Sequence, residues 1–218
     1  LNELKKIKKN HNIITISNLN AKKLSIMYLV NTSRITCIYN QNFSKKLILK
    51  DCIKEEPLLI YIGSVALDRG IEDIIKLSYQ YHILIIACNY KIEAIKYLEE
   101  NCFQDNLTIY KGMNYEKLLI KKVEEYRYPF FIILINPTHP SYRYALPNKF
   151  FQAQAIGCPI IAYDRTYLGS IILKYKCGLI YPQVSTKKFR IEVDMDEYVA
   201  MKDAMVNKLE LAISNEKL

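Results

Sequence analysis

Apolar and polar residues alternate with two different periods between residues 58 and 182. Short apolar runs between turn residues are typical of strands covered on both faces, whereas apolar residues at every third or fourth position are typical of helices. The runs predict strands at 58–62, 83–87, 107–110, 130–135, 160–162 and 178–181. The helical spacing predicts helices at 71–81, 91–100, 115–127, 147–156, 168–175 and 197–214.

This alternation predicts βαβ units with right-handed crossovers, and hence an α/β fold with a parallel sheet. The run at 130–135 is the most apolar and is expected at the centre of the sheet. Ligands of such sheets bind beyond the carboxyl ends of the strands. The segments expected to meet at that rim are 63–70, Asn89, 111–112, 136–149 and 164–169.

The stretch from Ala145 to Asp164 combines a polar loop, a short helix and a buried strand. Pro147 suits the first turn of a helix, and Gly157 followed by Pro159 suits its end. A helix N-terminus favours anions through its N–H groups and its dipole, and Lys149 adds a full positive charge there. The alternative is an ordinary capped helix with a solvated lysine.

The loop from Gly63 to Gly70 follows a predicted strand and precedes a predicted helix. It matches neither the dinucleotide-binding glycine pattern nor a P-loop. Gly63 permits close approach of the backbone to a ligand, and Arg69 can form paired hydrogen bonds to phosphate oxygens. A plain turn with a surface arginine is the alternative, but Lys149 provides a second phosphate-type group on the same predicted rim.

Charge and composition favour an anionic ligand. The 218 residues include 31 basic and 22 acidic side chains, for a net charge of +9, which suits phosphate-bearing ligands or an anionic membrane surface. The basic residues are spread along the chain without a basic-aromatic motif, which argues against nucleic acid. The six cysteines and three histidines lack zinc-site spacing. No apolar run reaches the length of a membrane span.

The ends of the chain differ from its middle. Residues 1–42 contain predicted strands at 13–16 and 34–39 and a helix near 18–28, too little for a domain, and are expected to be the remnant of a preceding α/β domain. Residues 43–57 are expected to be a linker. Residues 183–218 are expected to form a polar segment and a final helix that packs back on the domain 58–182 or on its neighbour.

Several motifs in the region 58–182 occur in a fixed order. They are Tyr61-Ile-Gly63 with Arg69-Gly70 after five residues, Lys111-Gly112, Pro147-Asn-Lys-Phe-Phe-Gln152, Gly157-Cys-Pro-Ile-Ile-Ala162 and Cys177-Gly-Leu-Ile. In combination they resemble the group-1 glycosyltransferases, of the family-four type, which transfer sugars from nucleotide donors. The resemblance implies the C-terminal, donor-binding domain of the GT-B architecture, with a Rossmann-like parallel sheet flanked by helices.

The resemblance also implies roles for individual residues. Arg69 and Lys149 would be catalytic. Contacts to the donor diphosphate are implied for Gly63, Ser64, Arg69, Gly70, Asn148, Lys149 and Phe150. Contacts to the base and ribose are implied for Tyr110, Lys111, Gly112 and Gln152, and contacts to the donor sugar for Tyr142, Tyr144 and Leu146.

The chain departs from the family pattern at three of these positions. Gln152 stands where the family usually has a glutamate that holds the ribose hydroxyls, and Tyr144 where many members have another glutamate. Ser64 replaces a basic residue common in the family. A glutamine still bonds a hydroxyl, but it lacks the second acceptor oxygen of a carboxylate.

The implied activity is metal-independent transfer of a hexose from a UDP- or GDP-sugar to a glycan or a lipid-linked acceptor, as in polysaccharide biosynthesis. No cofactor or metal is expected. The string nearest to a metal-binding Asp-x-Asp motif, Asp194-Met-Asp196, lies in the polar tail and is interpreted as a helix N-cap. The implied location is the cytoplasm, with peripheral contact of basic residues to the anionic inner membrane, and a preceding domain is expected in the full protein.

Three other functions stay open. A catalytically inactive fragment that binds a nucleotide or a partner is favoured by Gln152 and Tyr144, and a GT-B-type epimerase would need a carboxylate set that is not evident. Nucleic-acid binding rests on net charge alone. For the leading hypothesis, Lys149 is expected to matter more than Arg69 for diphosphate binding, and both side chains are expected to face solvent in the empty site.

Overall fold

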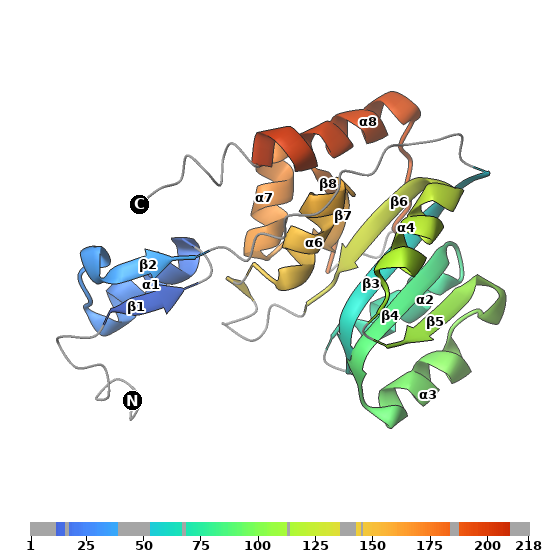
Figure 1. The fold of residues 1–218 in the computed structure, drawn as a ribbon, viewed down its shortest axis with the longest axis horizontal. Helices are drawn as coiled ribbons and strands as arrows, with labels where there is room; N and C mark the ends of the chain where they lie inside the picture. Colours follow the sequence, from blue (N-terminus) through green and yellow to red (C-terminus); the bar gives the residue numbers. More distant parts are fainter. Residues whose placement is uncertain are drawn as a thin grey trace.

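The computed structural model describes residues 12–15, 18–38, 53–66, 69–112, 114–135, 143–144, 146–183 and 188–209. Its main unit is a six-stranded parallel sheet (Figure 1). The strands are β3 (Lys54–Val65), β4 (His82–Tyr90), β5 (Leu107–Lys111), β6 (Tyr126–Ile133), β7 (Ile160–Tyr163) and β8 (Gly178–Tyr181).

The spatial order of the strands is β5-β4-β3-β6-β7-β8, and every neighbouring pair is parallel. The chain therefore starts in the middle of the sheet, winds outward to β5, and then returns to wind the other way from β6. This is the doubly-wound order, in which the direction of winding reverses between β3 and β6. The predicted parallel α/β sheet is confirmed, and β6, which includes residues 130–133 of the predicted run 130–135, lies at its centre beside β3.

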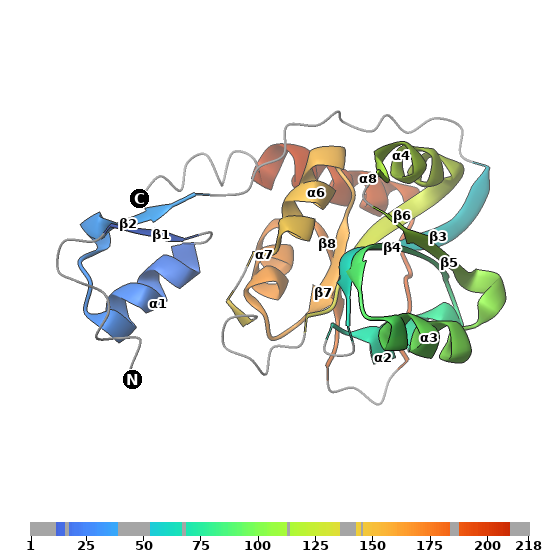
Figure 2. The same ribbon diagram turned by 60° about the horizontal axis from the view of Figure 1, so that its bottom comes forward.

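Helices cover both faces of the sheet. They are α2 (Ile71–Ser78), α3 (Ile92–Asn101), α4 (Glu116–Glu125), α6 (Asn148–Ile156), α7 (Tyr167–Tyr175) and α8 (Met195–Asp203). One core cluster joins the sheet to α4, α6 and α7, and a second joins the opposite face to α2 and α3. Figure 2 shows α4 on one side of β3–β5 and α2 and α3 on the other.

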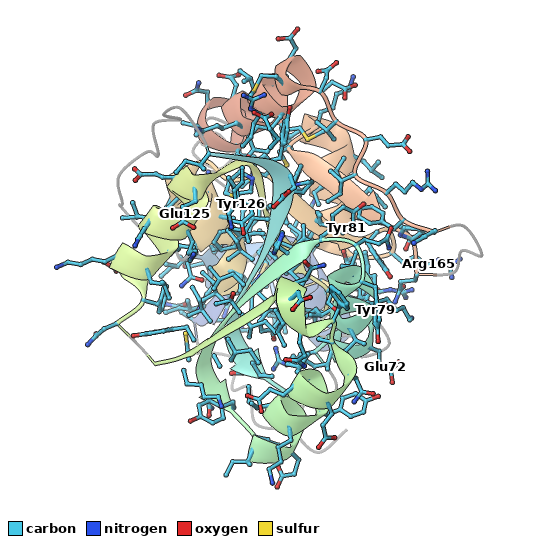
Figure 3. The ribbon with its side chains drawn as sticks, turned by 90° about the vertical axis from the view of Figure 1, so that its right-hand side faces the viewer. Glu72, Tyr79, Tyr81, Glu125, Tyr126 and Arg165 are labelled. Carbon is cyan, nitrogen blue, oxygen red and sulfur yellow. The ribbon has the colours of Figure 1, made fainter. Side chains whose placement is uncertain are left out.

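Among the boundaries that differ from the predicted ones are the starts of two strands. β3 begins at Lys54, inside the segment expected as linker, and Tyr126 begins β6 although its spacing suits the preceding helix. Lys54 pairs with Tyr126 across the two strands, and its ammonium donates to the Tyr126 hydroxyl over 2.9 Å. This long-range pairing overrides the local helical spacing of Tyr126, which Figure 3 shows next to Glu125 at the junction.

A small separate unit precedes the sheet. It consists of β1 (Ile13–Thr15), α1 (Asn18–Tyr28) and β2 (Ile35–Cys37), and it lies apart from the six strands in Figures 1 and 2. Its buried hydrophobic residues are Ala21, Val30 and Ile35. Ile26 of α1 is 75% exposed, because the strands cover the face that carries Ala21.

The described part of the C-terminal helix packs on the six-stranded unit through Tyr198, Ala204 and Met205. Asp194 caps α8 by accepting from the Glu197 N–H over 2.8 Å, so the interpretation of Asp194-Met-Asp196 as an N-cap is confirmed. A π-helical segment, Ala204–Lys208, continues α8 and buries Ala204 and Met205. Within the described ranges, no helix is both long and apolar enough to cross a membrane.

Candidate functional site

The candidate site lies at the carboxyl end of β3, where the strand order reverses. The register between β3 and β4 shifts between Gly63 and Ser64, and Gly63 has a φ of +127°. This conformation is rare for residues with a side chain. The backbone is therefore bent away from regular strand geometry at the residue that the sequence identifies as a point of close approach.

Lys149 from α6 occupies the space that Gly63 leaves open. A methyl group on Gly63 would lie 2.9 Å from Lys149 Cε, so any larger residue there would require the lysine side chain to shift. The Lys149 ammonium lies 3.4 Å from the centroid of the Tyr61 ring, which is a close cation–π contact. Pro147 is the N-cap residue of α6, one position before the first turn in which the sequence placed it, and Gly157 ends the helix with a φ of +66°, as predicted. Local capping thus places Lys149 in the first turn.

The surroundings of Lys149 disfavour its charge. Burial, and then the nearby guanidinium of Arg69, lower its pKa from 10.5 to about 7, although Cys88 acts in the opposite direction. The side chain was expected to face solvent, and this expectation is wrong, because Lys149 is half-buried against Tyr61 and Gly63. The structure does bring Arg69 close enough to Lys149 to lower the pKa of the lysine.

Arg69 is held at the start of α2. Its N–H donates to the Ala66 carbonyl over 2.9 Å, and the next residue, Gly70, has a φ of +73°. A methyl group on Gly70 would collide with the backbone carbonyl of Leu134, just after β6. The loop therefore packs closely against the strand beside β3, and Arg69 reaches the rim from a defined position.

Two side chains that sequence reasoning missed complete this cluster. Cys88, on β4, interacts with Lys149 and receives a hydrogen bond from the Gly63 backbone; burial is the main cause that raises its pKa. Tyr115, just before α4, accepts a hydrogen bond over 2.8 Å from Gln152 Nε2. Cys88 directly follows the predicted strand 83–87 and adjoins Asn89 of the expected rim, and this position could have predicted it as a site residue. The sequence around Tyr115 contains no comparable indication.

The residues expected near the base divide between two faces of β5. Tyr110 packs, like Tyr115, against the core on the α4 and α6 side. Lys111 instead pairs with Glu99 of α3 at 3.4 Å, on the opposite side of the sheet. The structure therefore does not bring the Lys111 ammonium to Gln152. Gly112 has a φ of +159°, and its N–H donates to the Ala87 carbonyl over 3.3 Å.

The remaining predicted residues have different surroundings. Phe150 and Leu146 are buried in the core, so only their backbones are available to a ligand, and the Phe150 N–H already donates to the Pro147 carbonyl. Asn148 is the exposed first residue of α6. Tyr144 lies under the Lys23 ammonium, 2.9 Å from its ring centroid. Tyr142 lies outside the described residues.

No metal-binding cluster of three or more His, Cys, Asp or Glu side chains occurs in the part of the chain that the structure describes. Two charged side chains of the rim, Arg69 and Lys149, lie close enough to each other for the guanidinium to affect the lysine pKa. An anion is the ligand that such an arrangement can bind.

Comparison with solved structures identifies the fold. The chain is similar to AviGT4, a glycosyltransferase involved in avilamycin A biosynthesis (TM-score 0.57, 10% identity, 92% of this chain and 61% of that one). It is also similar to WaaG, a glycosyltransferase involved in lipopolysaccharide biosynthesis (TM-score 0.56, 13% identity, 94% of this chain and 56% of that one). A third similar structure is the GtfA/B complex (TM-score 0.54, 14% identity, 94% of this chain and 39% of that one). No model of a protein family and no curated protein matches the sequence.

These likenesses confirm the predicted fold, an α/β unit of the glycosyltransferase GT-B type. The alignments cover more of the chain than the six-stranded unit alone, and so extend into the small preceding unit. The chain spans between 39% and 61% of the length of the three structures. Because the sequence identities are 14% or less, these comparisons show a shared fold.

Proposed function

We propose that this chain binds the donor of a glycosyltransferase, a nucleoside-diphosphate sugar, at the carboxyl end of β3. The observation that carries the proposal is the convergence of Lys149, Arg69 and the N-terminus of α6 beside Gly63. The lysine and the guanidinium lie close enough to lower the lysine pKa, an arrangement that favours an anion between them. The fold places this convergence where doubly-wound sheets bind their ligands.

The chemistry of sugar transfer fits these groups. As the glycosidic bond of the donor breaks, negative charge develops on the departing diphosphate. Arg69, protonated Lys149 and the positive end of the α6 dipole are already in place and stabilise that charge more strongly than the charge of the intact donor. We propose that the reaction proceeds without a metal or another cofactor.

Calorimetry with UDP, GDP and ADP at pH 6.5 tests the proposal, because Lys149 is mostly protonated at that pH. We expect at least one of them to bind, and no binding by any at millimolar concentration would contradict the proposal.

Lys149→Ala is expected to abolish measurable diphosphate binding, since it removes a charge next to the helix N-terminus. Arg69→Ala is expected to weaken binding about ten- to a hundredfold, as loss of one charge-assisted hydrogen bond does. Calorimetry with the same diphosphates measures both variants. If Lys149→Ala binds as well as the parent, the assignment of the diphosphate site is wrong.

The wider reaction is also a proposal. We propose that the donor is a UDP- or GDP-hexose and that the acceptor is a glycan or lipid-linked sugar in polysaccharide biosynthesis. A preceding domain would bind this acceptor, and the net charge of +9 would hold the protein at the anionic inner membrane, from the cytoplasmic side. Binding to vesicles of 30% anionic lipid that persists at physiological salt would support the membrane contact.

A binding-only function is the second candidate. It is favoured by Gln152, whose amide replaces the usual carboxylate and is engaged with Tyr115. Formation of a glycosylated product from a sugar nucleotide by this chain would exclude it. Binding of a nucleoside diphosphate without any turnover, including hydrolysis of the sugar nucleotide, would support it.

A further inference from the structure

The side-chain amide of Gln152 is held by a hydrogen bond from Nε2 to the Tyr115 hydroxyl, 2.8 Å long. An amide carries a donor and an acceptor on one carbon, and its terminal torsion is broad and roughly two-fold. A glutamine without a partner can therefore turn either group toward a ligand. Because Nε2 is engaged by Tyr115, the oxygen Oε1 is the group turned away from Tyr115.

Tyr115 is itself well anchored. It immediately precedes α4, is half-buried, and packs against the core cluster that includes Phe150 and Phe151 of α6. Burial is the main cause that raises its pKa, followed by Cys88 and Glu116. The hydroxyl thus keeps its proton at neutral pH and accepts from Gln152 as a neutral group.

Gln152 also lies at a suitable distance from the diphosphate site. It follows Lys149 by three residues on α6, which corresponds to about 4.5 Å along the helix axis, on the same face of the helix. In a nucleoside diphosphate the ribose is bonded directly to the diphosphate. A diphosphate at Lys149 therefore places its ribose within reach of Gln152.

We propose that Tyr115 is a positioning residue, which holds Gln152 so that its amide oxygen accepts a hydrogen bond from a ribose hydroxyl of the bound nucleoside diphosphate. This inference rests on the proposed function. Without Tyr115 the amide turns freely, and part of its population presents Nε2 in place of Oε1. The hydroxyl would then lose a preorganised acceptor, while the diphosphate contacts at Lys149 and Arg69 would be unchanged.

Tyr115→Phe tests the inference because it removes only the hydroxyl. Calorimetry would compare whichever of UDP, GDP and ADP binds the parent with its 2′-deoxy and 3′-deoxy forms and with inorganic pyrophosphate. We expect about three- to tenfold weaker binding of the ribonucleotide. The affinities for pyrophosphate, and for the deoxy form that lacks the bonded hydroxyl, should change less than about twofold. The preference of the site for the ribonucleotide over that deoxy form should therefore decrease.

Gln152→Glu provides the matched background. Both oxygens of a carboxylate are acceptors, so no partner is needed to select one, and Tyr115→Phe should then change ribonucleotide affinity less than about twofold. Equal weakening of ribonucleotide, deoxynucleotide and pyrophosphate would show a merely structural role and overturn the inference. So would an unchanged affinity of Tyr115→Phe. If no nucleoside diphosphate binds the parent, the proposed function itself fails.

Discussion

The ammonium of Lys149 is attracted by the Tyr61 ring and repelled by the guanidinium of Arg69. The Tyr61 centroid is 3.4 Å away, and Arg69 contributes to lowering the lysine pKa to about 7. In the unfolded chain the same lysine has a pKa near 10.5. The folded protein therefore binds fewer protons than the unfolded chain between about pH 7 and 10.5, so Lys149 makes the free energy of unfolding rise with pH in that window.

Lys149→Met should consequently stabilise the ligand-free protein at pH 7, because it replaces a group that must lose a proton or be buried with its charge. The advantage over the parent should shrink as pH rises toward 10.5, because the folded-state lysine is already neutral there and the unfolded-state lysine increasingly loses its proton. Thermal unfolding at pH 7 and 9.5 measures this effect. Lys96→Met, at an exposed position of α3, is the control and should show no such trend. Destabilisation of Lys149→Met at pH 7 would contradict the buried position of the charge.

The same pKa makes ligand binding depend on pH. A bound diphosphate favours the charged lysine and raises its pKa above the free value near 7. Affinity should therefore fall as pH rises above 7, by up to tenfold per pH unit until the pKa of the complex is reached. Lys149→Arg, which stays charged throughout, should lack this fall. Titrations between pH 6 and 9 measure both proteins, and parallel curves would show that Lys149 does not titrate on binding.

At the scale of elements, α8 is attached to the sheet by one aromatic side chain. Tyr198 is 1% exposed, donates to the Pro129 carbonyl over 2.7 Å, and packs edge-on against Tyr128 and Phe130 at 5.4 Å. The same carbonyl also accepts from the Cys158 thiol. Loss of the tyrosine hydroxyl therefore leaves the carbonyl with a partner, whereas loss of the ring leaves a cavity.

Tyr198→Phe should lower the free energy of unfolding by about 0.5–1.5 kcal/mol, and Tyr198→Ala by about 3–5 kcal/mol. Denaturant titration measures both. Val199→Ala, at an exposed position of the same helix, should change it by less than about 0.5 kcal/mol. Equal effects of Tyr198→Ala and Val199→Ala would mean that α8 does not depend on this contact.

At the scale of the whole chain, the two units differ greatly in the size of their cores. The unit formed by β1, α1 and β2 buries Ala21, Val30 and Ile35, whereas two extensive clusters enclose the six-stranded sheet. Ile14, Leu29 and Ile38 of the small unit are at least 50% exposed. Such a small parallel pair with one helix has little stability of its own.

Hydrogen–deuterium exchange of this chain should show the difference directly. Amides of β1, α1 and β2 should exchange within seconds to minutes, while those of β3 and β6 should exchange only with global unfolding. Mass spectrometry after proteolysis resolves these segments. Slow exchange in the small unit, comparable to that of β6, would show that contacts such as Lys23 with Tyr144 stabilise it much more than its core does.

The sequence by itself determined the features that depend on neighbouring residues. The βα alternation predicted the parallel sheet, Pro147 and Gly157 delimited α6, and Asp194 capped α8. Each of these follows from propensity, turn chemistry or periodicity within a few residues. The resemblance in motifs then selected the fold that the structural comparisons confirmed.

Only the tertiary structure decided the features that depend on residues far apart. Tyr126 belongs to a strand because Lys54 pairs with it, and Gln152 is oriented by Tyr115. Lys149 was expected to be solvated, but its side chain is half-buried because it packs against Gly63 and the Tyr61 ring. Local sequence patterns predict which helix or strand a residue belongs to. The burial and the hydrogen-bond partners of its side chain depend instead on which elements pack together. The protonation of Lys149 and the orientation of Gln152 are properties of that packing.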